Sequence, residues 1–492
     1  MIRSTSLLFC ALLLSMFQAA LGQVNLKSVD LAWDHFDRYK EPVIKDRFFK
    51  HADVVSLIRK HATSNLLISE EIGQSVRGRS INHLTLGTGK TKVLLWSQMH
   101  GDESTATMAL FDLFNFLRAD DEFNDLRKLI LSRLELHIVP MLNPDGAQQW
   151  KRRNDLEIDV NRDARMLVTP EGRALMSLAK RIQPAIGFNL HDQSTLYAAG
   201  RNDHTATLSF LAPAYDYPKS MNEVRKRATQ LILTMNKALQ TKVPGKIAKY
   251  DDAFDPRCFG DTFQGMGIST ILIESGGYYA DPEKQYIRKL NFYALLNAFV
   301  SIAEKTYTNE NLADYQAIPE NSRSLYDVLI RNVSITKEGI QFRTNLGIVR
   351  SQIKSSDFRS MSYNGRIEEL GDVELSHGYD EIEASSLTFT SGNIKLMRKS
   401  EWEALSPQQE FDLIREGYLF VKWTDGTSPL GPLHARLLNL TNKEINPIQT
   451  ASIGQQAQFL LSKDGKPVYA LLNGYVLDLN KDVTDVPNVF GY

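Results

Sequence analysis

The chain has 492 residues, 43% of them apolar and 23% charged, a balance typical of a globular protein large enough for two or three domains. Its 57 Lys and Arg residues nearly equal its 58 Asp and Glu residues, so the charge favours neither nucleic acid nor an anionic membrane surface as a partner. Charge alone therefore names no partner.

The first 22 residues have the pattern of a secretory signal peptide. Arg3 is followed by an apolar run at 7–17 and then by small residues that end at Gly22. A membrane anchor is the alternative, but the run is shorter than the about 20 apolar residues that a bilayer span needs. We therefore expect removal of residues 1–22 and a secreted or periplasmic mature chain without a membrane span. Cys258 is then the remaining cysteine, so core packing and bound metal must stabilise the fold without an internal disulfide.

Alternating strand-like and helix-like segments predict an α/β domain at residues 23–305. Short apolar runs that predict strands lie at 83–87, 92–98, 134–142, 185–191 and 268–274. Apolar residues at helical spacing predict helices over 105–117, 222–239 and 284–303. Such alternation favours a sheet that is covered by helices.

The character of the chain changes after residue 305. Residues 306–325 are polar, contain Pro319 and show no periodicity, which predicts a linker. Residues 326–492 contain β-rich pieces, and we expect them to form one or two small accessory β domains. Within them, the sequence KDGKP at 463–467 lies between two apolar runs, which predicts a β-hairpin.

Side chains that suit zinc stand at the ends of predicted strands. His100 and Glu103 follow the strand at 92–98 and lie three residues apart, so that both can reach one ion. His191 closes another apolar strand, and ligand sites in open α/β sheets lie at the carboxyl ends of strands. Each residue alone is more often structural. Together they predict one zinc ion, since catalytic zinc takes three protein ligands plus water.

Two further strand ends carry polar groups. The loop at 142–164 contains Arg152, Arg153 and Arg162, and guanidinium groups bind carboxylates and stabilise developing oxyanions. A solvated basic loop is the alternative interpretation. Glu274 ends an apolar strand, where a carboxylate can take a proton from a water molecule that a metal activates.

In their order, these motifs resemble the zinc carboxypeptidases of the carboxypeptidase A type over about residues 75–300. H-x-x-E after a strand, N-P-D-G at 143–146, an arginine, D-x-N-R at 159–162, a strand-terminal His and a strand-terminal Glu follow one another as in that family. The resemblance implies an α/β/α sandwich around a mixed, mostly parallel eight-stranded sheet, with zinc at the strand ends.

The resemblance also implies roles for the catalytic residues. The implied zinc ligands are His100, Glu103 and His191. Glu274 corresponds to the general base and Arg152 to the arginine that polarises the scissile carbonyl, with Arg153 as a competitor for that role. The implied reaction is hydrolysis of an amide bond by a zinc-activated water.

The remaining implied roles concern the substrate. Asn161 and Arg162 correspond to the pair that binds the terminal carboxylate of a peptide, and Tyr250 corresponds to a mobile tyrosine over the substrate. The chain departs from the family in Asp192, which follows the third ligand where the best-known members have a small hydroxyl residue. The side-chain pocket falls within 255–267, and the preferred side chain stays open.

The sequence thus predicts a secreted zinc metallocarboxypeptidase that acts on peptides with a free C-terminal carboxylate. A zinc deacylase of N-acyl amino acids, or a hydrolase of peptidoglycan stem peptides, would use the same ligand pattern. A non-catalytic binding protein whose β domains do the work is a third possibility. It is disfavoured because no metal ligand and no base is missing.

Overall fold

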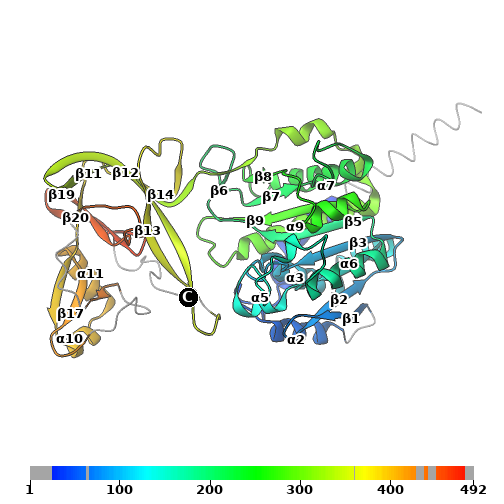
Figure 1. Cartoon of the computed structure of the whole chain (residues 1–492), viewed down its shortest axis with the longest axis horizontal. Coiled ribbons are helices and arrows are strands. Elements are labelled where there is room, and N and C mark those ends of the chain that lie inside the picture. The colour runs from blue at the N-terminus through cyan, green and yellow to red at the C-terminus, as the bar shows by residue number, and fades with distance from the viewer. Residues whose placement is uncertain (1–24, 63–65, 360, 428–436, 442–449, 482–492) are drawn as a thin grey trace, which may run out of the picture. The chain divides into compact units, whose positions relative to one another are not determined.

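The computed structural model describes residues 25–62, 66–359, 361–427, 437–441 and 450–481 (Figure 1). The predicted signal peptide lies outside the described residues. The chain divides into two compact units, of which the first comprises the described residues up to Gly200 together with His204–Ser322. The second comprises Arg201–Asp203 and the described residues from Arg323 onward.

An eight-stranded sheet forms the centre of the first unit. Its strands are β1 (Leu67–Gln74), β2 (Ser80–Leu86), β3 (Thr91–Ser97), β4 (Leu134–Val139), β5 (Ile186–Asp192), β7 (Leu208–Leu211), β8 (Ile247–Lys249) and β9 (Ser269–Ser275). They lie in the order β1-β2-β4-β3-β5-β9-β7-β8. The central pairs β4–β3, β3–β5 and β5–β9 are parallel, as is β7–β8, and the other pairs are antiparallel. The expected mixed, mostly parallel sheet is confirmed.

Helices cover both faces of this sheet. Those on one face include α2 (His51–His61), α3 (Thr105–Arg118), α4 (Asn124–Arg133), α7 (Glu223–Gln240) and α9 (Gln285–Glu304), and those on the other include α6 (Pro170–Ile182) and α8 (Phe259–Gly265). Alternate residues of β3 point to opposite faces, so Val93 and Leu95 join one hydrophobic cluster while Leu94 and Trp96 join the other. A strand buried on both faces is apolar throughout, which explains why it was recognisable in the sequence.

The segment expected as a linker differs from the expectation. Residues up to Ser322 belong to the first unit, and they contain the short helices η3 (Thr306–Asn309) and η4 (Leu312–Ala317). Tyr315 and Ile318 are buried in the core of that unit. Two apolar side chains among polar neighbours show no periodicity, yet they suffice to bind this segment to the sheet domain.

The second unit is built mainly from strands. Its larger sheet has the order β13-β12-β11-β15-β19-β20-β21, with β14 beside β11. These strands are β11 (Leu325–Lys337), β12 (Ile340–Lys354), β13 (Met361–Gly371), β14 (His377–Glu383), β15 (Thr388–Thr390), β19 (Phe459–Lys463), β20 (Lys466–Leu472) and β21 (Tyr475–Asp478). Asp464 and Gly465 join β19 to β20 with positive φ angles of 48° and 76°, so the predicted hairpin is confirmed.

A smaller sheet and two helices complete the second unit. The sheet has the order β16-β17-β18, formed by β16 (Asn393–Met397), β17 (Tyr418–Trp423) and β18 (Asn439–Leu440). The helices are α10 (Lys399–Glu403) and α11 (Pro407–Arg415). Their buried side chains form a hydrophobic cluster with residues of β17 and β20. The expected β-rich region therefore also contains helices.

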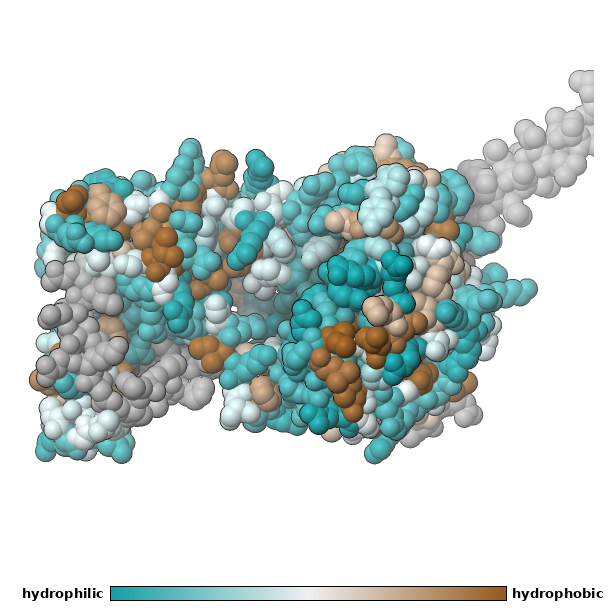
Figure 2. Space-filling model, in the orientation of Figure 1, coloured by the Kyte–Doolittle hydropathy of each residue, from teal (hydrophilic) through white to brown (hydrophobic). Residues whose placement is uncertain are grey.

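The exterior of the first unit is largely hydrophilic in the view of Figure 2, which also shows a compact apolar patch on that unit. Large apolar side chains that are exposed include Leu156, Met166 and Val168, all in the segment that leads to α6. Within the described ranges, no helix combines the length and the apolar character that crossing a bilayer requires.

Candidate active site

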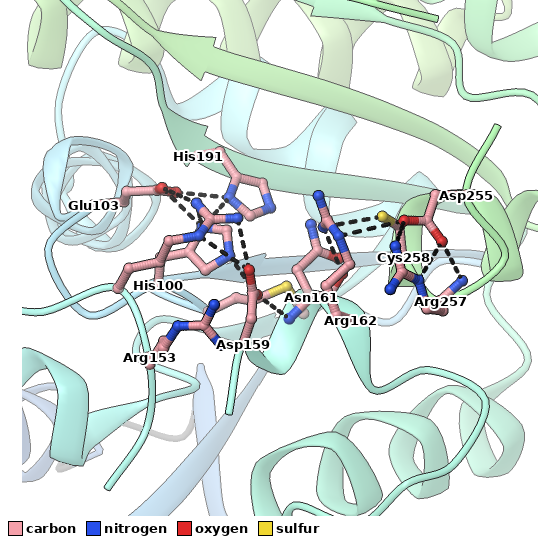
Figure 3. Close-up of polar contacts among 12 residues, drawn as sticks. His100, Glu103, Arg153, Asp159, Asn161, Arg162, His191, Asp255, Arg257 and Cys258 are labelled. Atoms are coloured by element: carbon pink, nitrogen blue, oxygen red, sulfur yellow. Dashed lines mark hydrogen bonds and ion pairs between the residues drawn. The ribbon is translucent and has the colours of Figure 1, made fainter. Parts of the chain in front are cut away.

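Three side chains that suit zinc meet at the carboxyl edge of the sheet (Figure 3). His100 lies in the turn after β3, Glu103 lies just before α3, and His191 lies near the end of β5. The two Glu103 carboxylate oxygens lie 2.7 Å from His100 Nδ1 and 2.7 Å from His191 Nδ1, and the two Nδ1 atoms are 3.2 Å apart. Among the described residues, no other group of three His, Cys, Asp or Glu side chains comes together in this way.

Asp159 determines which nitrogen of His100 is available to a metal ion. The Asp159 carboxylate accepts a hydrogen bond of 3.0 Å from His100 Nε2, so the Nδ1 lone pair faces the triad. Burial would lower the pKa of His100, but Glu103 and Asp159 raise it overall. Burial would raise the pKa of Glu103, but His100 and His191 hold it well below its usual value. Two imidazole nitrogens and one ionised carboxylate fit a tetrahedral zinc site.

The turn that carries His100 is packed tightly against the N-P-D-G segment. A Cβ atom at Gly101 would lie 2.0 Å from the carbonyl carbon of Gly146, so only glycine permits this approach. The N-P-D-G segment begins the short helix α5 (Pro144–Gln149), and the Asn143 side chain caps it by accepting from Gly146 N at 2.9 Å. These contacts place the loop after α5 beside the triad.

Arg152 is the arginine of this loop that reaches the triad. Its Nη1 lies 3.0 Å from His100 Nδ1 and 3.3 Å from the Glu103 carboxylate, and its Nε donates to Asp159 at 3.0 Å. A guanidinium group thus already approaches the cluster, as expected of side chains that attract a cation. Burial would lower the pKa of Arg152, but Glu103 and Asp159 raise it. Arg153 instead donates to a carbonyl within its own loop.

Glu274 lies on the strand next to His191. The two residues are direct partners in the parallel pairing of β5 with β9, so their side chains leave the sheet on the same face. Glu274 is buried, with 7% of its surface exposed. Burial and the negative charges of Glu103 and Asp192 raise its pKa well above the usual value, against the opposing charge of Arg152.

Tyr250 directly follows β8, which runs parallel to β7 and therefore antiparallel to β9. Its backbone N donates to Phe210 O at 2.9 Å, which fixes where the chain leaves the sheet. Burial and the charge of Glu274 raise the pKa of the Tyr250 hydroxyl, so this phenol lies within the electrostatic field of that carboxylate. The structure therefore brings Tyr250, which was predicted only from the resemblance, toward Glu274.

The carboxylate of Asp192, the residue at which the chain departs from the resemblance, contacts groups outside the triad. It accepts from Thr105 Oγ1 at 2.5 Å and from Lys284 Nζ at 3.0 Å. Lys284 Nζ also donates to Ser275 O at 2.9 Å. The backbone N of Asp192 donates to the Glu103 carboxylate at 3.2 Å. An acidic residue next to the third ligand is thus neutralised by a buried lysine.

Asn161 and Arg162 lie farther from the triad, on the far side of Asp159 in Figure 3. The Arg162 guanidinium is paired with Asp255 at 3.3 Å and donates to Cys258 Sγ at 3.2 Å, yet 40% of the side chain stays exposed. Asn161 Oδ1 accepts from Phe259 N at 3.0 Å. These contacts join the D-x-N-R loop to the start of α8. Burial raises the pKa of the Cys258 thiol to about 12, so this thiol is neutral.

Comparison with known proteins agrees with this site. Residues 55–257 match the sequence model of the zinc carboxypeptidases, a segment that contains all three triad residues. This part of the chain is similar to the zinc carboxypeptidases. The match ends before Glu274, so this residue lies outside it.

Individual relatives match shorter parts of the first unit. Carboxypeptidase SOL1 of Arabidopsis thaliana is 32% identical over 103 residues, which are 19% of this chain and 21% of that protein. Carboxypeptidase M of Mus musculus is 29% identical over 155 residues, 26% of this chain and 34% of that protein. A metallo-carboxypeptidase structure from Burkholderia cenocepacia has a TM-score of 0.43 at 19% identity, covering 52% of this chain and 70% of that one. The chain thus spans well under two thirds of the curated relatives' length.

Two residues of the candidate site had no role in the predictions from sequence. In the sequence, Asp159 was noted only as the first residue of the D-x-N-R motif. Its position three residues before an arginine was the signal that could have marked it as a site residue. Lys284 was expected only as the start of a helix. Its contact with Asp192 joins residues 92 positions apart, and no local sequence pattern indicates this contact.

Proposed function

We propose that the chain is a zinc carboxypeptidase that removes the last residue of a peptide by hydrolysis. The observation that carries this proposal is the buried triad of His100, Glu103 and His191, whose ligand atoms converge at the carboxyl edge of the sheet. A zinc ion held by these side chains would supply the Lewis acidity that activates a water molecule and polarises the scissile carbonyl. The similarity of residues 55–257 to the zinc carboxypeptidases supports this assignment.

Glu274 is the proposed general base. Its carboxylate would take the proton of the attacking water and return it to the leaving amine. A carboxylate whose pKa is raised by burial and by neighbouring negative charge is suited to both steps near neutral pH. Arg152 approaches the same space and can donate N–H groups to the carbonyl oxygen as negative charge develops on it.

Arg162 and Asn161 are the proposed binding residues for a free C-terminal carboxylate. Arg162 keeps part of its guanidinium exposed at the same edge of the sheet, and its pairing with Asp255 and Asn161 O holds the side chain in place. A planar guanidinium can bind a carboxylate through two parallel hydrogen bonds. Such binding of a peptide's C-terminal carboxylate by Arg162 is what favours an exopeptidase over a deacylase of N-acyl amino acids.

Metal content and the role of the base can be tested together. The purified protein should contain about one zinc per chain and lose its activity in a chelator. Glu274→Gln should keep its zinc, while kcat falls about a hundredfold or more because the amide cannot accept a proton. Glu171→Gln is the matched control, since Glu171 is also buried with a raised pKa but lies outside the triad. Full activity without metal would overturn the proposal.

Substrate class can be tested with one peptide in two forms. Amidation of the C-terminus removes the charge that Arg162 would bind, so kcat/KM should fall about ten- to a hundredfold. Arg162→Ala should cost the free acid a similar factor and barely affect the amide. Equal cleavage of acid and amide by the wild type would contradict a carboxypeptidase. Preference for an N-acyl amino acid would identify a deacylase, and cleavage confined to muropeptides a stem-peptide hydrolase.

We also propose that the chain is exported. The support is the pattern of residues 1–22, where Arg3 precedes an apolar run that ends in small residues. Sequencing the N-terminus of the mature protein should then find Gln23 as its first residue. Recovery of the intact N-terminus from the cytosolic fraction would contradict export.

A further inference from the structure

Lys284 is a buried lysine beside the candidate active site, and none of the steps above uses it. Only 3% of its surface is exposed, and it immediately precedes α9. Its backbone is left-handed, with φ at 50°, a conformation that costs energy for any residue with a side chain. Both features, burial of an ammonium group and a strained backbone, persist only where the surrounding contacts fix them.

The contacts of Lys284 join the two strands that carry the site. In the pairing of β5 with β9, His191 is opposite Glu274 and the next residues, Asp192 and Ser275, are opposite each other. Lys284 Nζ binds the carboxylate of Asp192 at 3.0 Å and the carbonyl of Ser275 at 2.9 Å. The ammonium group therefore bridges Asp192 and Ser275, which are the next residue pair along the two strands after His191 and Glu274.

The bridge also reaches the helix that follows Glu103. Asp192 accepts from Thr105 Oγ1, the first residue of α3, and its backbone N donates to the Glu103 carboxylate. Two strands that carry site residues and the helix that follows Glu103 thus meet at one buried ion pair. A hydrophobic pair would fill this space at a smaller desolvation cost, so stability alone does not explain the choice of residues.

We propose that Lys284 is a positioning residue that sets the distance between the metal triad and Glu274. This inference rests on the proposed function, because it assigns Glu274 to proton transfer. The ammonium group holds the end of β5 to the end of β9, and β9 carries the base. Without this bridge, the triad would still bind zinc, whereas the carboxylate of Glu274 would no longer be held at a fixed distance from the attacking water.

Lys284→Met tests the proposal, because methionine keeps most of the side-chain volume and removes the three N–H donors. We expect kcat to fall at least about tenfold. KM should stay within about twofold, and the zinc Kd should change by less than about tenfold, because no metal ligand is altered. Lys242→Met is the matched control. Lys242 is also largely buried, pairs with Asp30 at 3.2 Å and lies over the ring of Tyr293 in α9, so its loss should leave kcat unchanged.

The double variant Asp192→Asn with Lys284→Met separates positioning from folding. Removing both charges leaves no unpaired buried ion, so the urea midpoint should recover toward the wild-type value relative to Lys284→Met. If Lys284 positions Glu274, kcat stays at least about tenfold low in the double variant. Recovery of kcat together with stability, or a near-normal kcat in Lys284→Met, would overturn the proposal. An inactive wild type would instead refute the proposed function.

Discussion

At the scale of single residues, Asp159 links the two charges on which the chemistry depends. One carboxylate oxygen accepts from His100 Nε2, and the other accepts from Arg152 at 2.9 and 3.0 Å. Burial would raise the pKa of Asp159, but His100 and Arg152 lower it strongly, so the group stays ionised. The same residue therefore orients a proposed metal ligand and the arginine expected at the scissile carbonyl.

The two neighbouring arginines give the first prediction. Arg152→Gln should lower kcat/KM by about a hundredfold or more, because a donor to the developing oxyanion is lost. Arg153→Gln should stay within about twofold of the wild type, since Arg153 donates to its own loop and is exposed. Steady-state kinetics on one peptide measure both. A larger loss from Arg153→Gln would exchange the roles that the geometry gives to the two residues.

Asp261 gives a prediction about pH. It is buried at the start of α8, and burial raises its pKa to about 7 from an ordinary value near 4. The folded state keeps this proton between about pH 4 and 7 while the unfolded state loses it, so the free energy of unfolding falls as pH rises through this window. Asp261→Asn should therefore stabilise the protein by about 4 kcal/mol at pH 8 and clearly less at pH 5.

Urea unfolding of both proteins at pH 5 and pH 8 measures this difference. The asparagine keeps the oxygen that accepts from Asp255 N at 3.0 Å, so the substitution changes the titration and preserves the hydrogen bond. An equal effect at the two pH values would show that Asp261 does not titrate in this range.

At the scale of elements, the sequence predicted what periodicity and burial encode. The helices around 105–117, 222–239 and 284–303 are observed as α3, α7 and α9, and the buried strands are observed within a few residues of the predicted ranges. Their patterns are strong because a central parallel strand is apolar on both faces and a covering helix is apolar along one stripe.

The remainder of the fold and site depends on contacts between distant segments. Lys284 meets Asp192, and Tyr250 approaches Glu274, only because β9 is inserted between β5 and β7. Strand order is not encoded in any local pattern. The choice between Arg152 and Arg153 likewise depends on the direction in which one loop leaves α5, and sequence spacing does not determine that direction.

The contact between the His100 turn and α5 gives a prediction for these elements. Gly101→Ala places a methyl group 2.0 Å from the backbone of Gly146, so the turn and the helix must move apart. We expect a loss of at least about 2 kcal/mol in unfolding free energy and weaker zinc binding. Gly265→Ala is the control, because its nearest neighbour would be 3.9 Å away. Calorimetry and zinc titration measure both effects, and wild-type zinc affinity in Gly101→Ala would contradict the prediction.

At the scale of the whole molecule, the chain consists of two units with separate cores. The hydrophobic clusters that contain residues of β3 and β5 share no residue with the hydrophobic clusters of the second unit. Calorimetry of the full chain should therefore resolve two unfolding transitions. Removing zinc should lower the Tm of one transition by several degrees and leave the other in place, because a ligand stabilises only the unit that binds it. A single transition that moves as a whole would contradict this.

The order of the site residues along the chain has a consequence for biosynthesis. All three proposed metal ligands precede the proposed base Glu274, and β9, which carries Glu274, must enter the sheet between β5 and β7. A chain that emerges from the ribosome N-terminus first therefore completes its metal ligands before the base exists. A nascent chain that has already bound zinc would still lack the group that takes a proton from water. Under the proposed function, catalytic competence would then appear only when the last central strand of the sheet is in place.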